Sequence, residues 1–301
     1  MIKNHQFHPY YLTGFADAES CFYVRISRKK KSSTGWVVEG VFQIVLHKKD
    51  ITLLERIKVF LGVGEIYKQG GDAYIYKVSS KKDLAVILDH FDKYPLLTQK
   101  RADFILFKRI MELMKNKEHL TKEGLRKIME IRASINKGLS EEHKIAFPGI
   151  EPVERPIVPL RPIPDPNWFI GFTDGEGCFS VNITASKTLQ VGYQVQLLFR
   201  ISQHIRDAQL IGSFIEYLGC GRYAPVTGYN HGVFVVSGFT NILTKIIPLL
   251  KKYPLQSSAK DFEDFCKIAE LIESKVHLTQ EGLEQIRLIE SRMNNARSNQ
   301  P

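Results

Sequence analysis

LTGFADAES at residues 12–20 and FIGFTDGEG at residues 169–177 are two versions of one sequence, separated by 157 positions. At the same separation, FQIVLHKKD (42–50) aligns with FRISQHIRD (199–207), and further blocks recur in the same order towards the end of each copy. Similarity at one long, fixed period indicates that a structural unit is repeated. The chain is therefore predicted to be a tandem of two related units.

A proline-rich stretch separates the two copies. Seven of the 13 prolines lie between Pro148 and Pro166. Because proline disrupts the interior of a helix, this stretch should be an extended spacer. We expect an N-terminal repeat at residues 1–140, a linker at 141–166 and a C-terminal repeat at 167–301.

Each copy has the pattern of one short helix, four strands in two hairpins, and terminal helices. Apolar and polar residues alternate over residues 21–27, which is typical of a half-buried strand, here one that pairs with residues 36–47. The glycines at 70–71 mark the turn of a second hairpin. An apolar stripe over residues 125–135 indicates a helix that Thr121 could cap. The predicted class is α+β with antiparallel sheets.

The overall composition, 44% hydrophobic and 25% charged, is that of a globular protein and excludes disordered and collagen-like chains. No stretch reaches the roughly 18 consecutive apolar residues of a membrane helix, so no membrane partner is expected. Residues 1–10 have neither an apolar signal core nor a transit pattern, so we expect no targeting peptide. The four cysteines form no CxxC pair, which argues against a zinc site or a disulfide framework.

The positive charge is concentrated in the first half of the chain. The net charge is +10, and residues 1–150 hold 27 basic and 17 acidic side chains while the remainder holds 15 of each. Basic residues cluster at 28–31. This distribution is typical of a protein that binds a polyanion such as nucleic acid.

Each repeated motif carries two small residues four positions apart, which share one face of a helix: Gly14 and Ala18, then Gly171 and Gly175. Small residues at this spacing let a partner helix approach closely, and the other copy is the obvious partner. Packing the two copies about a pseudo-twofold axis would bring the next residues, Glu19 and Glu176, close together.

Two neighbouring carboxylates repel each other unless a cation lies between them. Glu19 and Glu176 therefore predict a hard divalent metal, held by few protein oxygens together with water and substrate phosphate. Such a metal would activate water and stabilise the leaving oxygen of a phosphodiester, which is the chemistry of a nuclease. Asp17 and Asp174 also recur, and we interpret them as structural contacts at the helix end.

The pair LTGFADAES and FIGFTDGEG resembles the signature of the LAGLIDADG homing endonucleases, in their monomeric two-motif form. The resemblance implies two αββαββα repeats, related by a pseudo-twofold axis, with the motif helices at their interface and antiparallel sheets forming a DNA-binding saddle. It also implies Mg²⁺-dependent cutting of both strands of a long double-stranded DNA site, with 3′ overhangs. The blocks around YPLLTQK and DFEDFCK are similar to those of fungal mitochondrial intron-encoded members, which implies a mitochondrial location.

The resemblance also suggests residues that assist the metal carboxylates. Gln203 matches a polar residue that orders water around the metal, whereas its counterpart in the first copy is Leu46. Lys100 matches a lysine that assists catalysis. In the second copy the helix register sets Ser258, which is not a lysine, opposite Lys100. The second copy is one residue shorter at this point, so Lys260 is the candidate for the assisting lysine there.

Strand alternation and the family's saddle together predict which side chains contact DNA. Arg and Lys can bind guanine, and Gln or Asn can bind adenine. The predicted contacts in the first copy are Tyr23, Arg25, Ser27, Arg28, Lys30, Gln43, Lys48, Lys68, Tyr76 and Lys77. Those in the second copy are Ser180, Asn182, Thr184, Ser186, Lys187, Gln194, Gln196, Arg200 and Arg222.

Two other functions fit the same doubled motif. One is an RNA maturase that binds intron RNA and assists its splicing, and the other is a sequence-specific DNA-binding protein that does not cut. The retention of Glu19 and Glu176 favours cutting, because neither alternative needs two metal-binding carboxylates. A double role in cutting and splicing stays open.

Overall fold

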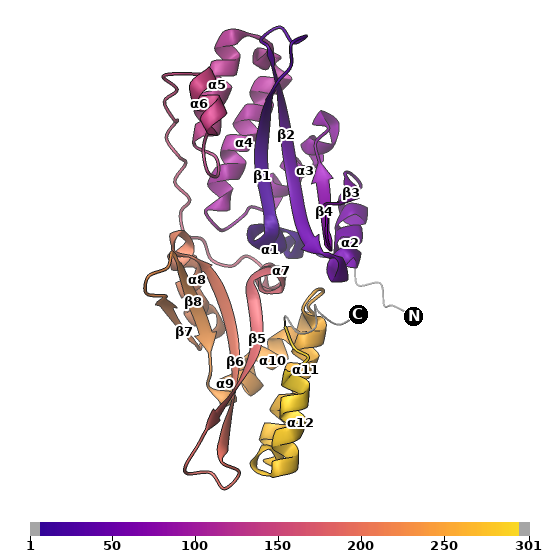
Figure 1. The fold of residues 1–301 in the computed structure, drawn as a ribbon, viewed down its shortest axis with the longest axis vertical. Helices are drawn as coiled ribbons and strands as arrows, with labels where there is room; N and C mark the ends of the chain where they lie inside the picture. The colour runs from indigo at the N-terminus through magenta and orange to yellow at the C-terminus, as the bar shows by residue number, and fades with distance from the viewer. Residues whose placement is uncertain (1–6, 295–301) are drawn as a thin grey trace. The chain divides into compact units, whose positions relative to one another are not determined.

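The computed structural model describes residues 7–294, and the chain divides into two compact units, Met1–Arg161 and Pro162–Pro301 (Figure 1). The first unit contains α1 (Pro9–Glu19), β1 (Ser20–Arg28), β2 (Trp36–His47), α2 (Ile51–Leu61), β3 (Glu65–Lys68), β4 (Ala73–Val78), α3 (Lys81–Lys93), α4 (Lys100–Lys115), α5 (Lys122–Ala133) and α6 (Glu141–Ala146). The second contains α7 (Pro166–Glu176), β5 (Gly177–Ala185), β6 (Tyr193–His204), α8 (Ala208–Leu218), β7 (Arg222–Pro225), β8 (His231–Val236), α9 (Phe239–Asn241), α10 (Ile247–Lys252), α11 (Ala259–Glu273) and α12 (Gln280–Glu290). Both units begin in the order αββαββα, which confirms the predicted repeat.

Each unit has one four-stranded antiparallel sheet. The strand order is β1-β2-β4-β3 in the first sheet and β5-β6-β8-β7 in the second. β1 pairs with β2 over its whole length, from Ser20 opposite Ile44 to Arg28 opposite Trp36. The turn between β3 and β4 contains Gly70 and Gly71 with φ of 98° and 52°, a backbone conformation that favours glycine. Both hairpins predicted in the first copy are confirmed.

Aromatic side chains fill the core between each sheet and its helices. The ring centroid of Phe22 in β1 lies 5.0 Å from that of Phe42 in β2 and 5.3 Å from that of Phe104 in α4. Phe179 has the same place in the second unit, 5.5 Å from Phe199. Because this face of each sheet is packed against helices, polar residues can occupy the opposite face.

We call the side of each sheet turned away from the aromatic core its polar face. In the first sheet, Gln43 is opposite both Cys21 and Lys77, so alternation places Tyr23, Arg25 and Ser27 on this face as well. In the second sheet, all the predicted strand residues share the polar face: Ser180, Asn182, Thr184, Gln194, Gln196, Arg200 and Arg222.

Two residues predicted for the polar face lie elsewhere. Tyr76 is fully buried, and its hydroxyl donates a hydrogen bond of 2.8 Å to the carbonyl of Val63. Lys68 is opposite Tyr74, which alternates with Tyr76, so Lys68 extends from the helix-covered side of the sheet. Both placements were wrong, because neighbouring residues of a strand point to opposite faces and Lys77 already occupies the polar face.

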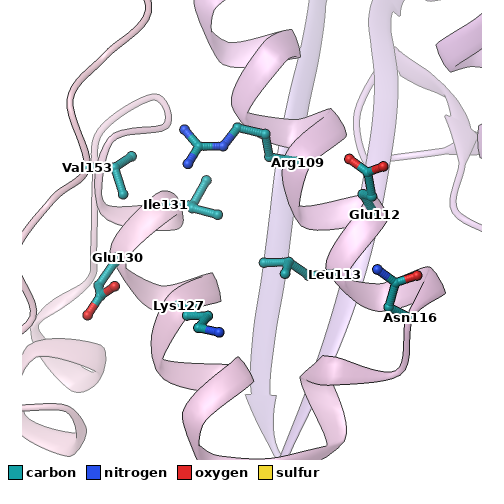
Figure 2. A pocket seen from close by; sticks show the side chains of 8 residues that line it. All are labelled: Arg109, Glu112, Leu113, Asn116, Lys127, Glu130, Ile131 and Val153. Carbon is teal, nitrogen blue, oxygen red and sulfur yellow. The ribbon is translucent and has the colours of Figure 1, made fainter.

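The linker packs on the first unit. It begins with the short helix α6, and residues 147–165 contain no helix or strand, as the prolines predict. Val153 lines a groove of 400 Å³ between α4 and α5 (Figure 2). The carbonyl of Val153 accepts a hydrogen bond of 2.5 Å from the Ser134 hydroxyl. Arg126 of α5 donates to the carbonyl of Gly149 at 2.7 Å. These contacts make the linker a structural part of the first unit.

Candidate active site

A buried carboxylate, Asp17, lies in the last turn of α1, and Glu19 is the final residue of the helix. Asp17 is 1% exposed and accepts hydrogen bonds from the backbone N–H groups of Leu97 (2.8 Å) and Thr98 (3.1 Å) and from the Thr98 hydroxyl (2.6 Å). Both oxygens of the carboxylate are therefore bound by protein donors, which fasten the end of α1 to the turn before α4. These bonds support the structural interpretation of Asp17.

The same turn leads into Lys100, the first residue of α4. Its Nζ donates hydrogen bonds to the carbonyl oxygens of Ala16 (2.8 Å) and Ala18 (3.1 Å). These carbonyls lie in the last turn of α1, where the helix dipole carries partial negative charge. The ammonium group is thus held at the end of the motif helix, where its charge acts on Glu19.

Glu19 has a perturbed pKa. Burial raises the pKa of Glu19, the charge of Lys100 lowers it, and the charge of Asp50 raises it again. Burial is the largest of these effects, so the ionised carboxylate is poorly solvated by its surroundings. A divalent cation at this carboxylate would favour its ionised form, and perturbed groups of this kind cluster at functional sites.

The second unit repeats this framework at the end of α7. Asp174 is 6% exposed and accepts backbone N–H bonds from three consecutive residues, Gln256 (2.6 Å), Ser257 (3.2 Å) and Ser258 (2.8 Å). Glu176 then ends α7, as Glu19 ends α1. In both units a buried aspartate fixes the helix end and a glutamate follows it.

Lys260, the candidate lysine of the second unit, lies one position later in its helix than Lys100. α4 begins at Lys100 and α11 begins at Ala259, with Gln99 and Ser258 as their N-caps. The helix starts thus differ by one residue, but the body of the two helices keeps the register that sets Ser258 opposite Lys100. Asn136 donates its backbone N–H to Asp103 and Asn294 donates its backbone N–H to Asp261, and these aspartates lie three residues after Lys100 and Ser258. The catalytic role of Lys260 stays a prediction.

Gln203, near the end of β6, lies beside the second glutamate. Its Nε2 donates a hydrogen bond of 3.1 Å to Oε1 of Glu176, and its Oε1 accepts the backbone N–H of His204 at 2.7 Å. Because the amide oxygen of Gln203 accepts the backbone N–H, its amide nitrogen faces the Glu176 carboxylate and donates to it. Leu46, the counterpart in the first unit, has no polar group to do the same, so the two glutamates have different surroundings.

The polar face of the first sheet carries charges of both signs. Glu39 lies 3.5 Å from Arg25 and 3.9 Å from Lys77, measured between charged atoms. Tyr67 is 53% exposed and is opposite Ile75, which places it on this face too. The sequence prediction did not include Glu39 or Tyr67. Alternation along β2 from Gln43 would have found Glu39, whereas Tyr67 is the neighbour of Lys68 in β3, so the choice of Lys68 excluded it.

The predicted contacts outside the strand centres lie at strand ends and turns. Four of these side chains are exposed, those of Arg28, Lys30, Lys48 and Lys187, and that of Ser186 is half-buried. The guanidinium of Arg28 lies 5.0 Å from the centre of the Trp36 ring, and its Nε is 3.2 Å from Glu142 of α6. Arg28 therefore joins the end of the first hairpin to the linker helix.

Comparison with known proteins gives consistent results. The model of the LAGLIDADG endonuclease family matches residues 12–111 and 169–269, one match in each unit. The chain is 39% identical over 285 residues to "Probable intron-encoded endonuclease 3" of Neurospora crassa, covering 93% of this chain and 53% of that protein. It is similar to the LAGLIDADG homing endonuclease I-SmaMI bound to cleaved DNA, with a TM-score of 0.95 and 43% identity over 97% of this chain and 98% of that one.

A second solved relative is I-GzeII in complex with its DNA target, with a TM-score of 0.91 and 42% identity over 97% of this chain and 100% of that one. I-SmaMI has also been solved with an uncleaved DNA target in the presence of calcium ions, and with one or two of its lysines replaced by alanine. The chain spans about half the length of the Neurospora crassa protein (53%) but nearly all of the solved I-SmaMI chain.

Proposed function

This chain belongs to the LAGLIDADG endonuclease family, and on that premise we propose that it is a sequence-specific homing endonuclease. It would cut both strands of a long double-stranded DNA site and leave 3′ overhangs. The observation that carries this proposal is the doubled acidic motif, in which Glu19 and Glu176 each end a helix that a buried aspartate fixes. The solved complex of I-SmaMI with cleaved DNA supports it.

Glu19 and Glu176 are the residues that would hold Mg²⁺, one carboxylate serving each strand. Within residues 7–294, no cluster of three or more His, Cys, Asp and Glu side chains is arranged to hold a metal. Two carboxylates, each at the end of a helix, fit a hard cation that takes few protein oxygens and keeps water and phosphate as its other ligands. When bound, Mg²⁺ activates water and stabilises the leaving oxygen of a phosphodiester.

The residues around these carboxylates would have distinct roles. Lys100, held on the carbonyls of α1, supplies positive charge near the phosphate that is cut. Gln203 holds Glu176 in one orientation and orders water beside it. Lys260 is the candidate for the role of Lys100 in the second unit, one position further along its helix.

The polar faces of the two sheets would read the bases of the target. The proposed contacts of the first unit are Tyr23, Arg25, Ser27, Arg28, Gln43 and Lys77, with Glu39 and Tyr67 added from the strand register. Those of the second unit are Ser180, Asn182, Thr184, Ser186, Gln194, Gln196, Arg200 and Arg222. Lys30, Lys48 and Lys187 would contact phosphates, which fix the register of the protein on DNA without reading sequence.

We also propose that the protein acts as a monomer, because one chain carries both matches to the family model. We propose a mitochondrial location because a similar protein of Saccharomyces cerevisiae is named a mitochondrial protein. Within residues 7–294, no helix is long and apolar enough to cross a bilayer. The maturase and the non-cutting DNA-binding protein remain the competing functions, and retention of both glutamates continues to favour cutting.

The test is to select bound duplexes from a randomised pool in calcium, add Mg²⁺, and map both strand ends. Calcium should support binding without turnover, as the I-SmaMI complex with an uncleaved target suggests. We expect staggered cuts at one place in the selected site. Tight, sequence-specific binding without cutting would contradict the proposal and favour the non-cutting protein, and preferential binding of structured RNA would favour the maturase.

A further inference from the structure

Arg155, in the proline-rich linker, makes four hydrogen bonds to the helical part of the first unit. Its Nη1 donates to Oδ1 of Asp103 (2.8 Å) and to the carbonyl of Ser134 (2.9 Å). Its Nη2 donates to Oδ2 of Asp103 (3.0 Å) and to the carbonyl of Gln99 (3.0 Å). The Asp103 side chain is 3% exposed, so the ion pair is largely shielded from solvent and has the forked geometry of a strong arginine–carboxylate contact.

These bonds act on the first turn of α4. Gln99 is the N-cap of α4 and makes no side-chain capping bond, and Asp103 lies one turn later. Lys100 lies between these two residues, so Arg155 binds α4 on both sides of the lysine whose Nζ reaches the end of α1, through the Gln99 carbonyl and the Asp103 carboxylate. A shift of this turn would move the ammonium group relative to Glu19.

Asp103 also connects the turn to the sheet. Its Oδ1 accepts the backbone N–H of Asn136 at 3.0 Å, and the Asn136 amide donates to the carbonyl of Phe22 in β1 at 2.8 Å. A chain of contacts therefore runs from the linker through α4 to the strand that follows Glu19. Asp103 is buried, Arg155 is half-buried, and the exposed Asn136 binds both the carboxylate and the strand, so a change at Arg155 should reach β1 through these bonds.

The second unit repeats part of this network, but its arginine binds a different aspartate. Asn294 donates its backbone N–H to Asp261 at 3.1 Å and its amide to the carbonyl of Phe179 at 2.9 Å. The aspartate–asparagine–strand connection is thus common to both units. Arg292, two residues after the end of α12, binds a different carboxylate, Asp264, at 2.8 and 3.0 Å.

We propose that Arg155 is a positioning residue for one of the two half-reactions: it holds the first turn of α4 so that Lys100 lies at Glu19. The inference rests on the proposed endonuclease function and extends it to a residue of the linker. Arg155 lies in the linker, and it acts through Gln99 and Asp103. Its loss should therefore slow the cutting of one strand and spare the other.

The test uses the full chain and a selected target duplex labelled separately on each strand. Arg155→Ala should slow cleavage of one strand about 10- to 100-fold, the usual cost of removing a residue that orients an active group. The rate on the other strand and the affinity for DNA in calcium should stay within about twofold. Lys100→Ala should slow the same strand, and adding Arg155→Ala to it should have little further effect, because both changes remove one function.

Two further variants separate positioning from a general effect on stability. Arg155→Lys keeps the charge but not the fork, so it should restore part of the lost rate. This variant also carries the test if thermal melting shows that Arg155→Ala is unfolded. Arg126→Ala is the matched control, because Arg126 also holds the linker, through the Gly149 carbonyl, but contacts no part of α4's first turn.

Equal slowing of both strands would overturn the proposal. So would a loss that adds in full to that of Lys100→Ala, or one that Arg126→Ala reproduces. If the wild-type chain binds its target without cutting, the proposed function itself fails. That failure is seen before any variant is compared, and it removes the basis of the positioning role.

Discussion

Asp17→Asn should destabilise the fold strongly although it barely changes the shape of the side chain. Asp17 is 1% exposed and accepts three hydrogen bonds, from the N–H of Leu97 and from the N–H and hydroxyl of Thr98. Asparagine keeps one acceptor oxygen and turns an NH2 group towards a donor, so at least one buried donor loses its partner. Losing a bond to a charged acceptor costs about 1.5–3 kcal/mol, and an unsatisfied buried donor adds ~1–3 kcal/mol. We therefore expect the free energy of unfolding to fall by about 2.5–6 kcal/mol.

Urea unfolding followed by circular dichroism measures this loss. With a slope of about 1–3 kcal/mol per molar urea, the midpoint should fall by about 1–6 M. Asp92→Asn is the matched control, because Asp92 forms an ion pair with Lys108 in which both side chains are 45% exposed. Such a pair contributes about 0.2–1 kcal/mol. If Asp17→Asn lowered the midpoint no more than Asp92→Asn, the buried bonds would not be what fastens α1 to the turn before α4.

Three more outcomes follow from the contacts of single residues. Because burial raises the pKa of Glu19, the stability that this group contributes is present in acid, below its unfolded pKa, and is lost as pH rises through the folded pKa. Glu19→Gln should therefore be at least as stable as the wild type at neutral pH, and the difference in stability between the two should shrink in acid. A urea midpoint of Glu19→Gln below that of the wild type at neutral pH would contradict this. Gln203→Leu gives the second unit the residue found at Leu46 and removes the hydrogen bond to a charged carboxylate, so it should slow cleavage of one strand about 10- to 100-fold. Equal slowing of both strands in a labelled cleavage assay would count against this. Tyr76→Phe removes the hydroxyl bond to Val63, so it should cost about 1 kcal/mol in urea unfolding, and weaker DNA binding in calcium would contradict the buried position of Tyr76.

Sequence patterns predicted the features that depend on local periodicity. Alternation over residues 21–27 identified β1 and its faces, and the glycines at 70–71 identified a turn that needs positive φ. The repeated motif identified the two helix ends and their acidic residues, because these come from contiguous stretches of chain. Thr121 caps α5 as predicted, with its hydroxyl accepting the N–H of Gly124 at 3.0 Å.

Features that depend on contacts between distant residues were not predictable in the same way. Arg155 and Asp103 are 52 positions apart, and no motif connects an arginine in a proline-rich linker with the start of a helix. The missing residue in the second unit could be set at several points of the sequence, and only the bonds of Asp174 before the helix and of Asp261 within it fix where it lies. Tyr76 failed for a simpler reason: neighbouring residues of one strand cannot share a face.

The most direct test of the proposed nuclease is strand-specific cleavage by Glu19→Gln and Glu176→Gln on a target selected with the wild-type chain. Each variant is first bound to the labelled duplex in calcium, and Mg²⁺ is then added. We expect both variants to bind the target with near wild-type affinity and to make no double-strand break, whereas the wild type cuts both strands with a stagger. Double-strand cutting by either variant, or loss of folding and binding in both, would show that these glutamates are not the metal-binding carboxylates of a nuclease.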